Sequence, residues 1–125
     1  MKKSKKWLLA GFSDEEISVL RKVADEIEFP APVVISPSQA DLTLEEILDG
    51  QEGHSDWQQF DTRLVLFANF QRSEISGFVA VYKTLGLPRP FFAAVTPHSI
   101  RWPLKKLLTD LAEERAEIEA QKAKK

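Results

Sequence analysis

The hydrophobic positions along this chain form the same succession of patterns twice. A short, almost continuous apolar run comes first in each half, at Trp7–Phe12 and at Leu64–Phe70. Runs of this length, bounded by polar residues, are typical of strands. Apolar positions at helical spacing follow, namely Ile17, Leu20, Ala24 and Ile27 in the first half and Ile75, Phe78, Val79, Tyr82 and Leu85 in the second. Each half therefore predicts a strand followed by an amphipathic helix.

Prolines end both predicted helices and introduce a second strand in each half. Paired prolines stand between helix and strand, at Pro30, Pro32, Pro88 and Pro90. Because the residue before a proline is pushed away from helical dihedral angles, a helix usually ends there. The apolar runs that follow predict strands at Val33–Ser36 and Phe91–Thr96. Each run ends at a hydroxyl side chain followed by another proline.

Helix-capping patterns mark further helix starts. Ser13 with Glu16, and Thr43 with Glu46, have the spacing of a capping box. Pro103 stands where the first turn of a helix tolerates proline. The final, longer helix has an apolar face formed by Leu104, Leu107, Leu108 and Leu111. The order strand–helix–strand–short helix is thus predicted twice.

The two halves also match residue by residue. The shift is 58 positions at first, where Leu8, Phe12, Ile17, Pro30 and Pro32 meet Leu66, Phe70, Ile75, Pro88 and Pro90. The shift is 60 further on, where Pro37, Leu44 and Leu48 meet Pro97, Leu104 and Leu108. A duplicated unit usually folds with near two-fold symmetry. We therefore expect one domain over residues 1–125, with an acidic repeat at 6–50, a linker loop at 51–61, a basic repeat at 62–112 and a solvated helical tail at 113–125.

Two fold classes fit this order of elements. Two βαβ units related by a two-fold axis fit an α+β fold, a ferredoxin-like sandwich with interleaved strands and extra helices on the second face. The alternative is a four-stranded parallel α/β sheet with helices on both faces. The strands are almost continuously apolar, which indicates that both sheet faces are covered. We favour the ferredoxin-like arrangement, because the segment joining the halves holds only one short helix.

Composition excludes several classes of protein. A chain of 125 residues that is 43% hydrophobic and 29% charged is an ordinary globular domain. It has no cysteine, which excludes disulfides, thiolate catalysis and cysteine-ligated metals. The lysine-rich start, Met1–Lys6, precedes an apolar run that is too short for a signal peptide or a membrane span. We expect a cytoplasmic protein without a membrane partner.

Charge divides the two halves. Residues from Trp7 to Asp61 include 13 acids and 2 bases, a net charge of −11. Residues from Thr62 to Leu111 include 7 bases and 2 acids, a net charge of +5. One interpretation, which we favour, is that opposite charges help the halves pair within the chain. The other is that the molecule stacks head to tail or presents its basic half to an anionic partner. The oligomeric state stays open.

The best candidate for a ligand site follows the last predicted strand. It combines a helix start with a cluster of basic, polar and aromatic residues, namely Thr96, His98, Arg101, Trp102, Lys105 and Lys106. Free N–H groups at a helix start, together with cations, can hold a phosphate or a carboxylate. The histidine can add a hydrogen bond or a proton. The competing interpretation is that Trp102 only anchors the helix, like Leu42 in the first half. The matching place in the first half, Ser36–Glu46, lacks the positive charge.

No other pattern suggests chemistry. Glu52, His54 and Asp56 alternate in the linker, but a glycine-rich loop with one histidine is a poor metal site. We therefore expect no metal and no cofactor. Only His54 and His98 are histidines, and neither has a partner that the sequence can place, so we assign no catalytic residue and lean against an enzyme. The aromatic residues of the basic half lie in strands expected to be buried, so we do not expect nucleic-acid binding.

Two stretches resemble the bacterial family called Domain of Unknown Function 3783. One is Gly11–Glu16; the other is Ala94–Pro97, followed by Trp102, Leu104, Leu107 and Leu108. The family unit is about half as long as this chain, and its best match is Arg63–Glu114, with the first half as a diverged copy. Where the family has an asparagine before the tryptophan, this chain has His98–Arg101. The resemblance implies a small bacterial α/β protein and supplies no activity.

These observations leave three hypotheses of function. The leading one is a small binding or regulatory module that recognises an anionic small molecule or a protein partner through Thr96–Lys106. The second is a small enzyme that uses His98 as acid or base and Arg101 as an anion anchor. The third is a structural interaction protein that acts through its charge split.

Overall fold

A computed structural model describes residues 5–60 and 62–123. The expectations for Met1–Ser4, for Asp61 and for Lys124 and Lys125 lie outside the described residues. The elements in chain order are β1 (Lys6–Ala10), α1 (Asp14–Glu26), β2 (Val33–Val34), the 3₁₀ helix η1 (Pro37–Gln39), α2 (Leu44–Leu48), β3 (Leu64–Ala68), α3 (Arg72–Tyr82), β4 (Phe91–Ala94), the 3₁₀ helix η2 (Ser99–Arg101) and α4 (Leu104–Ala123).

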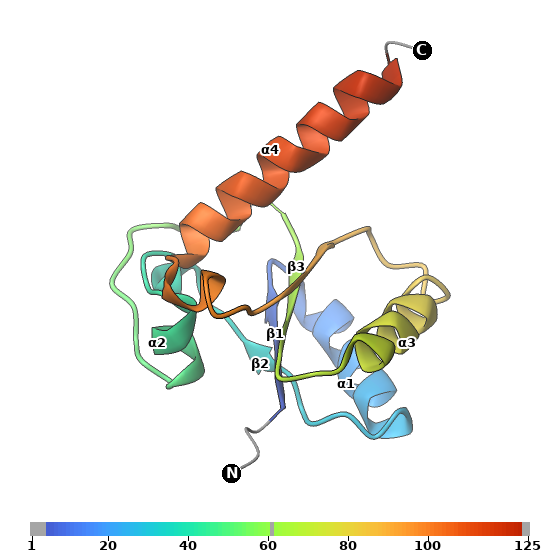
Figure 1. Ribbon diagram of the computed structural model, residues 1–125. Helices are drawn as coiled ribbons and strands as arrows, with labels where there is room; N and C mark the ends of the chain where they lie inside the picture. The colour runs from blue at the N-terminus through green and yellow to red at the C-terminus, as the bar shows by residue number, and fades with distance from the viewer. Residues whose placement is uncertain (1–4, 61, 124–125) are drawn as a thin grey trace.

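The four strands form one mixed sheet in the order β2-β1-β3-β4. The central strands β1 and β3 are antiparallel, whereas β2 runs parallel to β1 and β4 runs parallel to β3. Figure 1 looks at this sheet nearly edge-on, with α2 and α4 on one side and α1 and α3 on the other. The fold is therefore α+β, with helices covering both faces of the sheet.

The strand order corrects both predicted topologies. In an interleaved ferredoxin-like sheet, the two strands of each βαβ unit are separated by a strand of the other unit. Here β1 lies directly beside β2, and β3 lies directly beside β4. The parallel alternative is also wrong, because β1 and β3 are antiparallel. The hydrophobic pattern could not separate these arrangements, since strand order depends on which edges pair and the pattern reports only which faces are buried.

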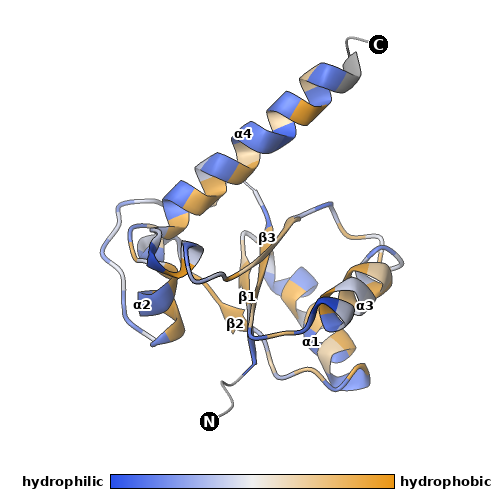
Figure 2. Ribbon diagram, viewed as in Figure 1, coloured by the Kyte–Doolittle hydropathy of each residue, from blue (hydrophilic) through white to orange (hydrophobic). Residues whose placement is uncertain are grey.

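Alternate residues of the central strands supply two separate cores. Trp7, Leu9 and Phe67 pack against α1 and α3, while Leu8 and Leu66 pack against α2 and α4. All residues of β3 are buried. Figure 2 shows the apolar colouring of the strands and of the helix faces turned toward them. The prediction that both sheet faces are covered is therefore confirmed.

The core beneath α1 and α3 is built around Phe78. Its ring centroid lies 5.0 Å from that of Trp7, 5.5 Å from that of Phe67 and 5.8 Å from that of Phe29. Both Trp7 and Phe78 are almost completely buried. The indole Nε1 of Trp7 donates a hydrogen bond to the Pro30 carbonyl at 2.6 Å, which satisfies its one polar atom.

The predicted capping boxes form at the starts of α1 and α2. The Glu16 N–H donates to Ser13 Oγ at 3.2 Å, and the Ser13 N–H donates to Glu16 Oε1 at 2.8 Å. Thr43 and Glu46 form the same pair of bonds before α2. The strand β1 ends earlier than predicted, because the residue after it, Gly11, has a φ of 81° and leaves extended geometry.

The helix α4 packs on the sheet only with its first part. Leu104, Leu107 and Leu108 are buried, whereas beyond Leu111 the helix extends away from the body (Figure 1). Arg115 is the exception. Its guanidinium lies 3.8 Å from the centroid of the Phe91 ring and donates to the Pro90 carbonyl at 3.1 Å. This contact holds the first turn of the exposed part against the start of β4.

Candidate functional site

Two open cavities lie where the parallel strands end. The first, here called the β3–β4 cavity, has a volume of about 440 Å³, and the second, the β1–β2 cavity, has a volume of about 500 Å³. Both are lined by residues that follow the carboxyl ends of their strands. Ligands of sheets with parallel strands commonly bind at this end, because the loops that leave the strands diverge there.

The β3–β4 cavity brings together one cation and one anion from different halves of the chain. Arg101 of η2 and Glu45 of α2 both line it, and both are exposed. The three ion pairs found among the described residues include neither of them. An apolar wall completes the cavity, formed by Leu48, Val95 and Ile100. The cavity therefore offers a guanidinium and a carboxylate to a solute beside an apolar surface.

Thr96 lines this cavity, but its hydroxyl already has a structural task. The Ser99 N–H donates to Thr96 Oγ1 at 2.9 Å, and the Thr96 N–H donates to Ser99 Oγ at 2.9 Å. This reciprocal pair resembles a capping box and fixes the turn that carries Arg101. Ser99 is buried and was not predicted, because a capping box has Glu or Gln at this spacing and not Ser.

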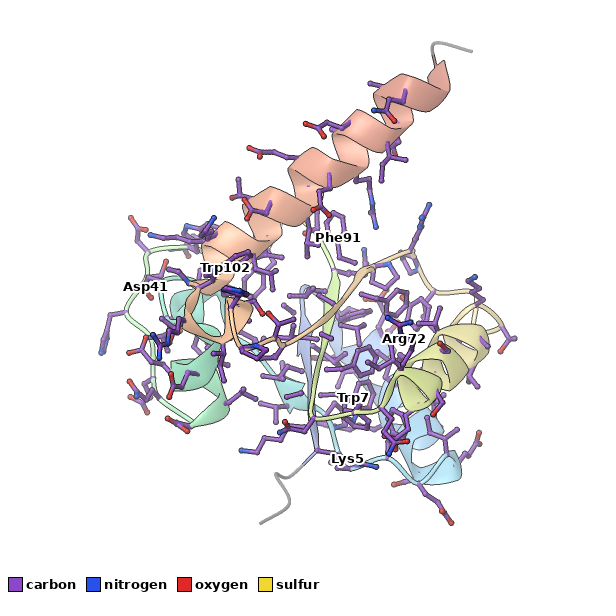
Figure 3. The ribbon with its side chains drawn as sticks, viewed as in Figure 1. Lys5, Trp7, Asp41, Arg72, Phe91 and Trp102 are labelled. Atoms are coloured by element: carbon purple, nitrogen blue, oxygen red, sulfur yellow. The ribbon has the colours of Figure 1, made fainter. Side chains whose placement is uncertain are left out.

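The other predicted site residues lie outside the cavity. Trp102 is partly buried and packs against the core cluster beneath α2 and α4, beside the start of α4 (Figure 3). The ammonium of Lys106 lies 4.6 Å from the centroid of the Trp102 ring and 3.2 Å from a carboxylate oxygen of Asp110. His98 and Lys105 are exposed. The structure thus brings together only Thr96 and Arg101 of the six residues.

The free helix start that we expected at Pro103 does not exist. The Leu104 N–H donates to the Leu42 carbonyl at 2.8 Å, and the Lys105 N–H donates to the Ala40 carbonyl at 2.9 Å. These donors are the ones that an anion would need. The prediction was wrong because the first half of the chain supplies the acceptors, a contact that no local pattern encodes. Trp102 and Leu42 both pack on the same core, as the anchor interpretation requires.

The second half of the chain, which contains Arg101, matches a known protein family. Residues 63–118 match the family model described as Domain of unknown function (DUF3783). The DUF3783 segment runs from just before β3 into the exposed part of α4, so it contains Thr96, Arg101 and Trp102. The resemblance inferred from the sequence is confirmed for this segment. No curated protein and no solved structure matches the chain.

The β1–β2 cavity is lined mainly by residues that precede the DUF3783 segment, and its charged residues differ from those of the β3–β4 cavity. Its basic residue is Arg63, and Asp14 and Ser36 also line it. The guanidinium Nε of Arg63 donates to Glu16 Oε1 at 3.0 Å. Asp41 stands 60 positions before Arg101, at the spacing of the predicted repeat, so this half has an acid where the other has a base. The cation of this cavity is therefore already paired with a carboxylate.

The contact between Arg63 and Glu16 makes the stability of the protein depend on pH. Burial tends to raise the pKa of this carboxyl, but hydrogen bonds from Arg63 and Ser13 outweigh it and hold the pKa below its ordinary value. A lowered pKa in the folded state stabilises the protein above the ordinary pKa, and this contribution is lost as the pH falls through the lowered value. We expect Glu16→Gln to cost about 1–2 kcal/mol at pH 7 and little at low pH.

Urea unfolding of wild type and Glu16→Gln between pH 7 and pH 3 checks this expectation. The control is Glu15→Gln, which removes an exposed carboxylate from the same turn and should change stability by less than about 0.5 kcal/mol. A wild-type advantage over Glu16→Gln that stays constant down to pH 3 would contradict the assignment.

No three His, Cys, Asp or Glu side chains within 5–60 and 62–123 lie close enough to hold a metal ion, and this includes Glu52, His54 and Asp56. No helix in that part of the chain is long and apolar enough to cross a bilayer.

Proposed function

We propose that this protein is a small, non-enzymatic binding module whose ligand occupies the β3–β4 cavity. The observation that carries the proposal is the meeting of Arg101 and Glu45 at one cavity, with no ion pair to either among the described residues. The composition and the family resemblance support a role in the bacterial cytoplasm. The ligand is a small anionic molecule, since a planar guanidinium binds carboxylate and phosphate through two parallel hydrogen bonds.

Glu45 narrows the class of ligand. A carboxylate at the cavity repels a second anionic group and accepts hydrogen bonds from an ammonium or an amide. Leu48 and Ile100 add apolar surface. These walls suit a small molecule with one anionic group, one donor group and a short apolar part, as in an amino acid. A volume of about 440 Å³ is within the range of small-molecule sites.

Replacing Arg101 tests the proposal. Thermal-shift and NMR titrations of the full chain use inorganic phosphate, amino acids, phosphorylated metabolites and nucleotides as probes. For any probe that binds, we expect Arg101→Gln to weaken binding roughly 10- to 100-fold, because the loss of a charge-assisted hydrogen bond costs about 1.5–3 kcal/mol.

The matched control is Lys105→Gln, which removes an exposed cation outside the cavity. Equal weakening by both substitutions would mean that the ligand responds only to the charge of the basic half. If no probe binds the wild type, the small-molecule proposal fails.

One observation favours part of the hypothesis that this is a structural interaction protein acting through its charge split. The Arg63–Glu16 ion pair joins a base of the basic half to an acid of the acidic half. This supports a charge split that acts inside the chain, in the pairing of its halves. The enzyme hypothesis gains no comparable support, since His98 does not line the cavity that contains Arg101.

A further inference from the structure

Residues that are equivalent in the two halves face each other at two places. In the central strand pair, Leu8 lies opposite Leu66, which is 58 positions further along the chain. Before α2 and α4, Thr43 forms an isolated antiparallel bridge with Pro103, which is 60 positions further along. These separations are the two shifts of the sequence repeat. A pair of equivalent residues can face each other only where a two-fold axis passes between them.

The hydrogen bonds beside the second of these places are reciprocal. The Leu44 N–H donates to the Trp102 carbonyl at 3.0 Å, and the Leu104 N–H donates to the Leu42 carbonyl at 2.8 Å. Each residue in the first bond is 60 positions from its counterpart in the second. Exchange of donor and acceptor roles between equivalent residues is the signature of a self-complementary, two-fold interface.

The register within each half agrees with the same axis. Leu8 pairs with Val33 in the parallel pair of the first half, and its equivalent Leu66 pairs with Ala93 in the second. Val33 and Ala93 are 60 positions apart, so the change of shift from 58 to 60 occurs before this pair. The strand β4 is two residues longer than β2, and the additional residues lie at its start. One two-fold axis therefore relates the paired strands of the sheet and also relates the start of α2 to the start of α4.

We infer that the contact between the halves is a self-complementary dimer interface, and that a second copy of this chain can take the place of either half. In such a pair, the first half of one copy binds the second half of the other, and two copies exchange halves. Charge favours this exchange over pairing of like halves, because the acidic half carries −11 and the basic half +5. The Arg63–Glu16 ion pair is preserved in the exchanged dimer.

The linker keeps the halves within one chain. Gly50 lies beside Lys6 and Leu8 near the start of β1, whereas Leu64 pairs with Ala10 at its end. The linker must therefore run along the sheet, and on its way it docks on η1, where the Ser55 N–H donates to the Ser38 carbonyl at 2.9 Å. A linker too short for this path cannot fold back within one chain, but it can extend straight into a second copy.

Shortening the linker tests the inference in the full chain. Deletion of residues 51–60 leaves only four residue steps from Gly50 to Leu64, a reach of about 14 Å, and should double the mass in light scattering while the circular dichroism spectrum stays native. The control replaces the same residues with a Gly/Ser segment of equal length and should remain a monomer. A folded monomer after the deletion would overturn the inference.

If the shortened protein does not fold, a chain cleaved in the linker tests whether the two halves bind each other as separate chains. A protease site inserted between Gly53 and His54 allows cleavage of the folded wild type. The two fragments should elute together and should recover the native spectrum after denaturation and mixing. Fragments that separate on cleavage and do not recombine would overturn the inference.

Discussion

Replacement of Phe78 with alanine is expected to lower the free energy of unfolding by about 3–5 kcal/mol. The ring is almost completely buried and contacts the rings of Trp7, Phe29 and Phe67, which come from separate segments of the chain. Truncation removes these edge and stacking contacts and leaves a cavity that rigid aromatic neighbours cannot fill. Because small domains are stable by only about 5–15 kcal/mol, the variant is expected to unfold at much lower urea concentrations.

Urea unfolding followed by tryptophan fluorescence measures this change, since Trp7 lies in the same cluster. The control is Val19→Ala on α1, where the side chain is 37% exposed and little packing is lost. That variant should stay within about 0.5 kcal/mol of wild type. A decrease of less than about 2 kcal/mol in the free energy of unfolding of Phe78→Ala would contradict this prediction. It would show that α1 and α3 can move to fill the space of the missing ring.

Gly11→Ala is expected to destabilise the protein by roughly 3–5 kcal/mol, from backbone strain and steric overlap together. Gly11 has a φ of +81°, a region that costs any residue with a Cβ about 1–2 kcal/mol. A Cβ at this position would also lie 2.1 Å from the Thr62 carbonyl oxygen, which belongs to the backbone just before β3. The clash therefore forces the two central strands apart at the end where Ala10 pairs with Leu64.

Gly50 provides a matched control for this prediction. It has the same φ of +81°, but a Cβ added there has no atom within 4 Å. Gly50→Ala should therefore show the backbone term alone, about 1–2 kcal/mol. Thermal and urea unfolding of both variants separates the two causes. Equal losses would mean that Thr62 moves aside at no cost.

The sequence predicted those parts of the fold that local patterns determine. Strand and helix types, the caps at Ser13 and Thr43 and the burial of Leu104 follow from spacing and side-chain chemistry, and the structure has them. The strand order was not predictable, because it depends on backbone edges that the pattern of side chains does not describe. The left-handed geometry of Asn69, with a φ of 69°, also ended β3 earlier than its apolar run suggested.

The candidate site was only partly predictable for the same reason. Arg101 and Thr96 stand close together in sequence, so a local pattern could find them. Glu45 comes from the other half of the chain and reaches the cavity only through the folded contact between α2 and η2. The same long-range contact closes the start of α4 with carbonyls of Ala40 and Leu42. Glu45 and the closed start of α4 were therefore not predictable, because both depend on contacts between distant parts of the chain.

The central position of β1 has a consequence for the protein while it is being made. The ribosome completes the first half before β3 exists, so the edge of β1 that β3 covers stays open during that interval. An open apolar edge is a template for pairing with other chains. Lys5 and Lys6 stand at the start of this strand, and the rest of the first half carries a net charge of −11. We expect this charge to keep nascent chains on neighbouring ribosomes apart until the basic half emerges and offsets part of it.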